Sequence, residues 1–357
     1  MNKRPPAQFY AGDLFGEIYQ AHQAPPRQTP LAALPGLAVC ATAALAAAWL
    51  ANSYGFPIIL LGLLVGLALS FLSEDARTHA GLDFASRHFL RAGIVLLGLQ
   101  VTAAQVLALG WVSFVALLAV MAVAMLAGVA AARLAGEPRE AGVLAGGATA
   151  ICGASAALAL YGVIGQNRLS RERFSVTLVG VALASAIAMA SYPLIASVLG
   201  FTDSQAGFLI GASVHDAAQA IGGAFAYSDA AGQDATIVKL ARVAMLAPVV
   251  ALVAVWLGRG GGKNVGRARW TAIAVPWFIL GFLALVTVNS IVQLPPGLAD
   301  IALTTSKGLL LLAVTAAAMR SRLGLLVAAG WRPLVPVFAA SFASFIAALT
   351  AAALVID

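Results

Sequence analysis

Apolar segments of about twenty residues recur along the whole chain, and this pattern restricts the fold more than any other feature. A helix of that length spans the hydrocarbon core of a bilayer, and lipid offers no partner to an unpaired peptide group. We therefore predict an all-α polytopic membrane protein with about nine to eleven transmembrane segments. Eleven apolar segments lie at residues 31–51, 56–72, 89–109, 112–134, 141–164, 174–199, 205–226, 236–257, 271–293, 299–319 and 333–355.

The overall composition agrees with this class, since 61% of the residues are hydrophobic and 10% are charged. The first thirty residues contain prolines and charges but no apolar stretch long enough for a secretory signal. We predict a cytoplasmic tail at 1–30, followed by a single membrane domain at 31–357. The net charge of +7 comes from basic residues in short connections, which indicates membrane topology rather than nucleic-acid binding.

The connection after the fifth apolar segment, with Arg168, Arg171 and Arg173, separates two topologies. If all eleven segments cross, these three arginines lie outside, against the positive-inside rule that the other connections follow. If the fifth and seventh segments are re-entrant or broken hairpins that enter from opposite faces, the arginines are cytoplasmic and nine crossings remain. We favour the hairpin topology, and the sequence leaves both open.

The fifth and seventh segments contain similar glycine-rich stretches, at 141–157 and 207–223. In both, the motif Ala-Gly-x-Leu-x-Gly opens the element and small residues interrupt the apolar pattern. Irregular backbone at membrane depth is tolerated only where protein covers it or where it lines a cavity. We predict that the two stretches face each other near the midplane, within inverted-repeat halves at approximately 52–200 and 201–357.

His215 and Asp216 lie in the middle of the second stretch. An ionised aspartate in hydrocarbon costs roughly 2.5–3.5 kcal/mol, so such a residue faces a partner charge, a protein interior or a cavity. In the functional interpretation Asp216 holds a proton, a cation or an orienting hydrogen bond, while His215 titrates. In the structural alternative Asp216 pairs with a lysine and His215 bonds a backbone carbonyl.

Three cations are predicted at membrane depth. Lys239 and Arg242 lie on one face of the eighth segment, where they can bridge an anion, reach the interface or pair with Asp216. Lys307 lies deeper in its segment and is the stronger candidate for a buried cation. Backbone amides at 152–155 can bind an anion at the start of a half-helix, unless these small residues serve helix packing. The predicted substrate-binding set is Thr149, Cys152, Gly153, Ala154, Ser155, Ser213, His215, Asp216, Gln219, Lys239, Arg242 and Lys307.

Three stretches carry a family resemblance: GGATAICGASA at 146–156, GASVHDAAQAIG at 211–222 and ATIVKLARVAMLAP at 235–248. In this order they resemble the YeiH family of bacterial inner-membrane proteins, whose alternative family name describes sulfate export. The resemblance implies a transporter in the bacterial inner membrane, distantly similar in fold to bile acid:sodium symporters and cation/proton antiporters. It also implies a substrate such as sulfate, sulfite or a small organosulfonate.

The first functional prediction is a secondary transporter of a small anion. The alternatives are an ion-coupled symporter related to the bile acid:sodium symporters, a passive anion channel, or a structural subunit. An enzyme is not expected, because adjacent His215 and Asp216 cannot orient each other as a triad requires. No phosphate-binding loop is found, so energy comes from a gradient, the membrane potential or exchange. Partners are the anion, a proton or sodium ion, the bilayer and, as an open option, a second copy; no cofactor, metal or nucleic acid is expected.

Overall fold

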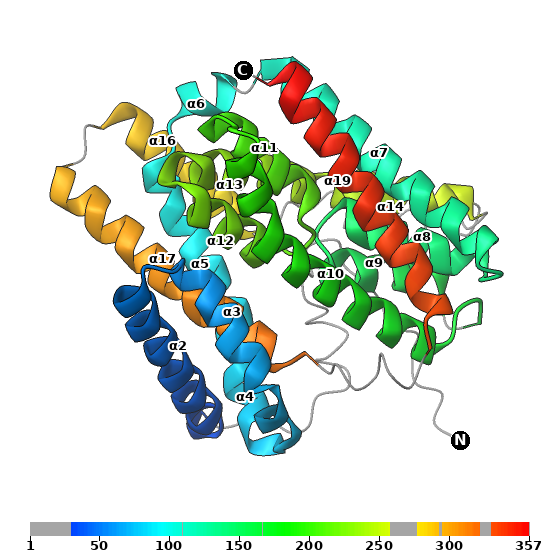
Figure 1. Cartoon of the computed structure of the whole chain (residues 1–357), viewed down its shortest axis with the longest axis horizontal. Coiled ribbons are helices and arrows are strands. Elements are labelled where there is room, and N and C mark those ends of the chain that lie inside the picture. Colours follow the sequence, from blue (N-terminus) through cyan, green and yellow to red (C-terminus); the bar gives the residue numbers. More distant parts are fainter. Residues whose placement is uncertain are drawn as a thin grey trace.

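The computed structural model describes residues 30–108, 110–165, 167–257, 277–292, 295–321 and 330–356, and these ranges fold into helices without strands (Figure 1). Six helical runs in them are long and apolar enough to cross a membrane. They are α2 (Leu34–Tyr54), α7 (Gly110–Leu134), α10 (Arg171–Val198), α13 (Asp229–Ala244) continued by α14 (Leu246–Trp256), α17 (Pro296–Met319) and α19 (Val335–Val355). The chain is an all-α polytopic membrane protein, as predicted.

Shorter helices complete the bundle. Three of them are apolar, α3 (Ile58–Ala68), α9 (Ala154–Ile164) and α16 (Trp277–Ile291). Another run joins α4 (Ala76–Phe84), a π-helical turn (Ala85–Phe89) and α5 (Leu90–Leu97). The remaining short elements are 3-10 turns at Pro30–Ala33, Ser70–Glu74, Gly98–Gln100 and Arg332–Leu334, and α6 (Ala103–Ala108).

The run through α4 and α5 corrects the third predicted segment, which was placed at 89–109 but begins at Ala76. Arg87, which precedes the predicted segment, and Arg91 both lie within this run. The hydropathy pattern excluded its first half because that half is charged, yet its carboxylate Asp83 forms an ion pair with Arg320 at the end of α17. Gln100 at the other end bonds the carbonyl of Ala299 at 2.8 Å, so the run and α17 are antiparallel.

The first glycine-rich stretch forms a hairpin. Helix α8 (Arg139–Ala150) enters the bundle and α9 (Ala154–Ile164) returns. Its two ends are tied together, because Glu137 before α8 pairs with Arg173 at 3.0 Å at the start of α10. Within the hairpin, a Cβ on Gly147 of α8 would overlap Leu160 of α9, which is possible only if the two helices lie side by side.

The second stretch forms a matching hairpin from α11 (Asp203–Ser213) and α12 (Ala217–Tyr227). The hydroxyl of Tyr227 donates to the carbonyl of Phe201, and Ser228 bonds Asp203. The chain therefore leaves the hairpin where it entered. Helix α13 then runs parallel to α11, since Ser204 contacts Asp234 and Gly211 lies against Ala235.

The two hairpins enter from opposite ends of the bundle, because α10 crosses the whole bundle between them (Figure 1). This is the hairpin topology we favoured, and the structure does not have the plain eleven-span alternative. The turn between α10 and α11 coincides with the predicted boundary at residue 201. The division of the chain into two inverted halves stays a prediction.

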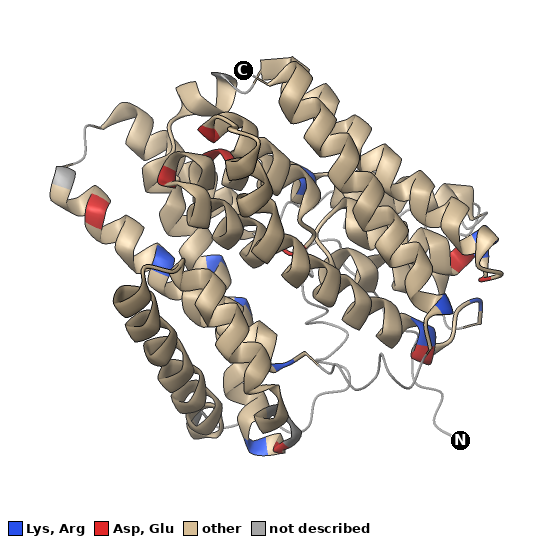
Figure 2. Ribbon diagram, in the orientation of Figure 1, with Lys and Arg blue, Asp and Glu red and all other residues tan. Residues whose placement is uncertain are grey.

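Lysine and arginine lie mainly at one end of the bundle, beside several acidic residues, whereas the acidic residues of the opposite end have few such neighbours (Figure 2). We call the end that carries Arg77, Arg168 and Arg173 the basic end. The opposite end, which carries Asp203 and Asp229, is the acidic end. The hairpin of α8 and α9 starts from the basic end, and the hairpin of α11 and α12 starts from the acidic end.

The packing of α7 on α8 depends on small residues. A Cβ on Gly128 of α7 would lie 2.6 Å from the Cα of Gly146 in α8, closer than any real side chain allows. Glycine at both positions therefore lets the two backbones touch, which is the usual means of close packing between membrane helices. Figure 1 shows α7, α8, α10 and α19 on one side of the molecule and α2, α3, α4 and α17 on the other.

The hairpin topology predicts the sidedness of exposed positions. In a background without Cys40 and Cys152, cysteines at Leu134 and Asn167 should react with an impermeant maleimide from one side of the membrane, and a cysteine at Ala230 only from the other. Spheroplasts and inverted vesicles give the two sides. Labelling of the Asn167 and Ala230 positions from the same side, with Leu134 on the other, would restore the eleven-span topology.

Candidate functional site

The breaks in the two hairpins, at residues 151–153 and 214–216, lie against each other. Gly153 adopts φ +70°, a conformation that L side chains rarely adopt. A Cβ built on it would lie 3.8 Å from the backbone nitrogen of Asp216. We call residues 149–155 and 213–219 the crossing. The two stretches meet inside the protein, as the sequence predicts.

Lys239 of α13 is fully buried beneath the crossing. Its ammonium group donates to the carbonyls of Ile151 at 3.0 Å and Val214 at 2.9 Å, and also to that of His215. An ammonium has three N–H donors, so all of them are used on main-chain carbonyls. The carbonyls belong to both breaks, and Lys239 therefore joins the two hairpins.

Arg242, one turn further along α13, completes this arrangement and is also fully buried. It donates to the carbonyls of Thr149 at 2.7 Å and Ala150 at 3.0 Å in the first hairpin. It also donates to those of Gly211 and Val214 at 2.9 Å in the second. These carbonyls end α8 and α11, where the helix dipole is negative and a cation is stabilised.

Of the three alternatives for Lys239 and Arg242, full burial excludes the interface, while the anion bridge and the pairing with Asp216 stay predictions. Both cations are committed to carbonyls that the broken helices leave without a helical partner. A buried carbonyl without a donor costs roughly 1–3 kcal/mol, so the break itself creates the need for the two cations.

His215 lies on the covered side of the crossing and is fully buried. Its Nε2 is 2.8 Å from the hydroxyl of Ser341 in α19, and that hydroxyl donates its one proton to the carbonyl of Val337. Nε2 is therefore the donor, and the ring binds α19 rather than facing a cavity. The structural alternative predicted a backbone carbonyl as the partner of His215; the ring interacts with the backbone of Thr149 and Ser213, and its Nε2 also bonds the Ser341 hydroxyl. Thr149 and Ser213 are likewise fully buried, and the Ser213 hydroxyl bonds the carbonyl of Leu209.

Asp216 begins α12 as its N-cap, and its carboxylate accepts the backbone N–H of Gln219 at 3.1 Å. Its own backbone N–H donates to the hydroxyl of Ser185 at 2.9 Å. The orienting hydrogen bond predicted for Asp216 is thus present. In the first hairpin, α9 begins at Ala154, so the positive N-terminal ends of α9 and α12 lie on the same side of the crossing.

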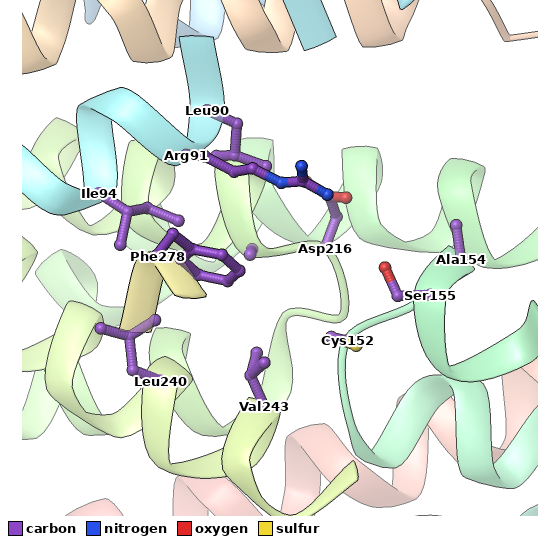
Figure 3. Close-up of a pocket in the computed structure, with 11 residues that line it drawn as sticks. Leu90, Arg91, Ile94, Cys152, Ala154, Ser155, Asp216, Leu240, Val243 and Phe278 are labelled. Carbon is purple, nitrogen blue, oxygen red and sulfur yellow. The ribbon is translucent and has the colours of Figure 1, made fainter. Parts of the chain in front are cut away.

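A cavity of about 410 Å³ reaches this side of the crossing from the basic end. Its mouth is lined by Asp83, Arg87 and Arg320, and its inner end by Asp216 and Gln219. A second space of about 20 Å³, enough for about one water molecule, adjoins it and is lined by Cys152, Ala154 and Ser155 (Figure 3). Cys152 is a buried free thiol there.

Basic residues outside the predicted site set line these spaces, Arg87 and Arg320 the larger cavity and Arg91 of α5 the smaller one. Arg91 is only 6% exposed, and Figure 3 shows its guanidinium pointing toward Asp216. The spacing of Asp83, Arg87 and Arg91, four residues apart each time, places all three on one helix face. That spacing is the signal that could have identified Arg91 as a cavity residue.

Lys307 lies away from the crossing. It pairs with Asp229, is half-buried and stacks over the ring of Phe225 at 5.2 Å. With Phe225 it lines a separate cavity of about 260 Å³ that is also lined by Gly222. Between the two cavities a Cβ on Gly222 would overlap Ile59 of α3, so α12 and α3 are in direct contact there.

Comparison with known proteins now gives a family. A family model described as conserved hypothetical protein 698 matches residues 35–337. The UPF0324 membrane protein TauZ of Paracoccus pantotrophus is 37% identical over 299 residues, which cover 84% of this chain and 88% of the relative. The chain belongs to the UPF0324 family. This is the YeiH family that the three sequence stretches resemble.

Other UPF0324 relatives agree. The UPF0324 membrane protein RA0957 of Rhizobium meliloti (strain 1021) is 38% identical over 80% of this chain and 82% of the relative. The UPF0324 membrane protein CT0845 of Chlorobaculum tepidum is 35% identical over 84% of this chain and 83% of its own length. No solved structure matches the chain. The similarity spans the crossing and both helical sides of the bundle.

The hydrogen bonds of Lys239 and Arg242 to the carbonyls at the crossing predict that replacing these cations destabilises the protein more than replacing Lys307 does. Lys239→Met should lower the free energy of unfolding by about 3 kcal/mol or more, because it leaves three buried carbonyls without a donor. Thermal unfolding in detergent measures this. Lys307→Met is the matched control and should cost at most about 1 kcal/mol, since its ion pair is partly exposed. A stable Lys239→Met protein that has lost anion binding would make Lys239 a substrate ligand.

Proposed function

We propose that this protein is a secondary transporter of a small anion in the bacterial inner membrane, with the basic end in the cytoplasm. The observation that carries the proposal is the cavity from the basic end to the crossing, where Arg91 and the starts of α9 and α12 converge. Each of these features favours negative charge. The positive-inside rule supports the orientation.

The binding of Lys239 and Arg242 to the carbonyl ends of α8 and α11 strengthens the preference of the site for an anion. Because Lys239 and Arg242 bind the negative ends of α8 and α11, the field of those ends is neutralised on the covered side. The positive ends of α9 and α12 face the cavity without such compensation, apart from Asp216. A small oxyanion can accept hydrogen bonds from Arg91, from the Ser155 hydroxyl and from backbone amides at 154–155. Sulfate, sulfite and small organosulfonates have this chemistry, and the family resemblance supports them.

The acidic end of the protein is closed, and this favours a transporter over a passive channel. The cavity leads from the basic end to Asp216 and Gln219, whereas toward the acidic end Gly222 of α12 is in contact with Ile59. Beyond that contact lies the ion pair of Lys307 with Asp229. A site that is reached from one end while the other end is closed is the arrangement that alternating access requires. Movement of the hairpins against α3 and α5 would open the acidic end.

Transport by purified protein in vesicles tests this function. Vesicles preloaded with sulfate, sulfite or methanesulfonate should accelerate uptake of the labelled anion by counterflow. Arg91→Gln should weaken anion binding by about 10–100-fold, because one charge-assisted hydrogen bond contributes roughly 1.5–3 kcal/mol. Arg77→Gln is the control and should transport normally, since Arg77 is 82% exposed and pairs with Asp75.

Three results would contradict the proposal. A protein that dissipates an anion gradient without counterflow is a channel. Equal transport by Arg91→Gln and the unmodified protein would show that the anion does not bind at Arg91 in the cavity. Failure to bind or move any oxyanion in the series, with folded protein in the membrane, would exclude this class of substrate.

A further inference from the structure

We propose that Asp216 is a built-in anion that competes with the transported anion for Arg91, so that loading the site places a proton on Asp216. The transported anion would then move together with a proton. This inference rests on the proposed anion transport and adds the coupling ion. It follows from an incomplete helix cap at the crossing.

The cap of α12 can be compared with the cap of α11 in the same protein. At α11, Thr202 accepts the backbone N–H of Gln205, and the Gln205 side chain accepts the N–H of Thr202 at 3.0 Å. This reciprocal arrangement is a capping box. Asp216 and Gln219 have the same spacing at the start of α12, with the acceptor at the N-cap and glutamine three residues later.

The box at α12 is only half formed. The N–H of Asp216, which would bond Gln219 in a capping box, donates to Ser185 of α10 instead. Gln219 is only 6% exposed, and its Oε1 has no hydrogen-bond partner within the part of the chain that the structure describes. This acceptor lies in the same helical turn as the carboxyl group of Asp216, and the O–H of that group, once protonated, can donate to it. Gln219 is therefore a positioning residue for the protonated form of Asp216.

The charges around Asp216 explain why a proton and an anion arrive together. From α5, Arg91 points toward the carboxylate. From α13, Lys239 and Arg242 are committed to carbonyls, and His215 binds Ser341 on the covered side. Asp83, Arg87 and Arg320 lie at the mouth of the cavity, where Asp83 pairs with Arg320, and the Cys152 thiol lines the small space.

Arg91 is thus the cation that faces Asp216 from the cavity side, and two anions at this site would share it. A carboxylate and an oxyanion a few ångströms apart in a protein repel strongly. Uptake of a proton from the bulk solution, relayed through cavity water to a carboxylate oxygen, neutralises Asp216 and removes this repulsion. The second oxygen of the protonated group can still accept the N–H of Gln219, so the start of α12 is retained. The new O–H donates to Gln219 Oε1, and Arg91 is released to the transported anion.

Calorimetry on the purified full-length protein tests the coupling. Sulfate and methanesulfonate are suitable probes, because their own charge is constant over about pH 5–8. Binding in two buffers of different ionisation enthalpy should show the uptake of about one proton. The affinity should fall up to tenfold per pH unit as Asp216 ionises. Below that range the proton is already bound, so the affinity should be highest and constant.

Asp216→Asn should bind the same anions without proton uptake and with an affinity that does not depend on pH. Asparagine is also a good N-cap, so this variant is expected to fold. Gln219→Met removes the acceptor for the proton and should lower the midpoint of the pH profile by about 0.5–1 unit. Asp75→Asn changes a carboxylate that pairs with the exposed Arg77, outside the crossing, and should leave the profile unchanged.

The outcomes separate the coupling from the transport. Anion binding without proton uptake, equal in the unmodified protein and Asp216→Asn, would overturn the coupling and leave the transport proposal standing. The same holds if binding requires sodium, or if proton uptake persists in Asp216→Asn and disappears in His215→Gln. Failure of the unmodified protein to bind any of the anions at any pH would overturn both proposals.

Discussion

The structure depends on the two buried cations that satisfy the ends of two broken helices. A helix that stops at membrane depth leaves carbonyls that neither water nor lipid can satisfy. Lys239 and Arg242, on consecutive turns of α13, supply seven hydrogen bonds to carbonyls of both hairpins. Because each cation binds both breaks, the hairpins are held at one fixed separation. The favourable interaction of each charge with the negative helix ends offsets the cost of burying it.

This arrangement gives the crossing two different sides. On the covered side the carbonyl ends of α8 and α11 are neutralised, and His215 attaches the crossing to α19. On the open side the amino ends of α9 and α12 meet the cavity with Arg91 opposite. The polarity of the site therefore comes from the direction of four short helices as much as from any charged side chain. Asp216 is the exception, and its position at the start of α12 makes it the group whose ionisation controls the local charge.

The two hairpins with their neighbours α7 and α13 form one part of the molecule, which can move relative to the part that contains α3 and α5. Close glycine contacts join α7 to α8 and α11 to α13, so the hairpins are tied to their own neighbours. Contacts with the other side of the bundle are made by α12 on α3 and α17, with Gly222 against Ile59 and Arg91 opposite Asp216. A substrate that binds between these parts touches both. Its affinity can therefore depend on how far they are separated, which is the energetic basis of alternating access.

Much of this architecture follows from the sequence, because lipid imposes its requirements locally. Apolar length determines the helices, the twin glycine stretches predict two facing hairpins, and an aspartate within such a stretch marks the crossing. The role of each cation was decided by the tertiary structure alone. Arg242 bonds a carbonyl 93 residues away, Arg91 turns out to lie in the cavity, and Lys307 lies with Asp229 at the acidic end. A charged side chain takes its role from the groups within about 3 Å of it, and only folding brings those groups together.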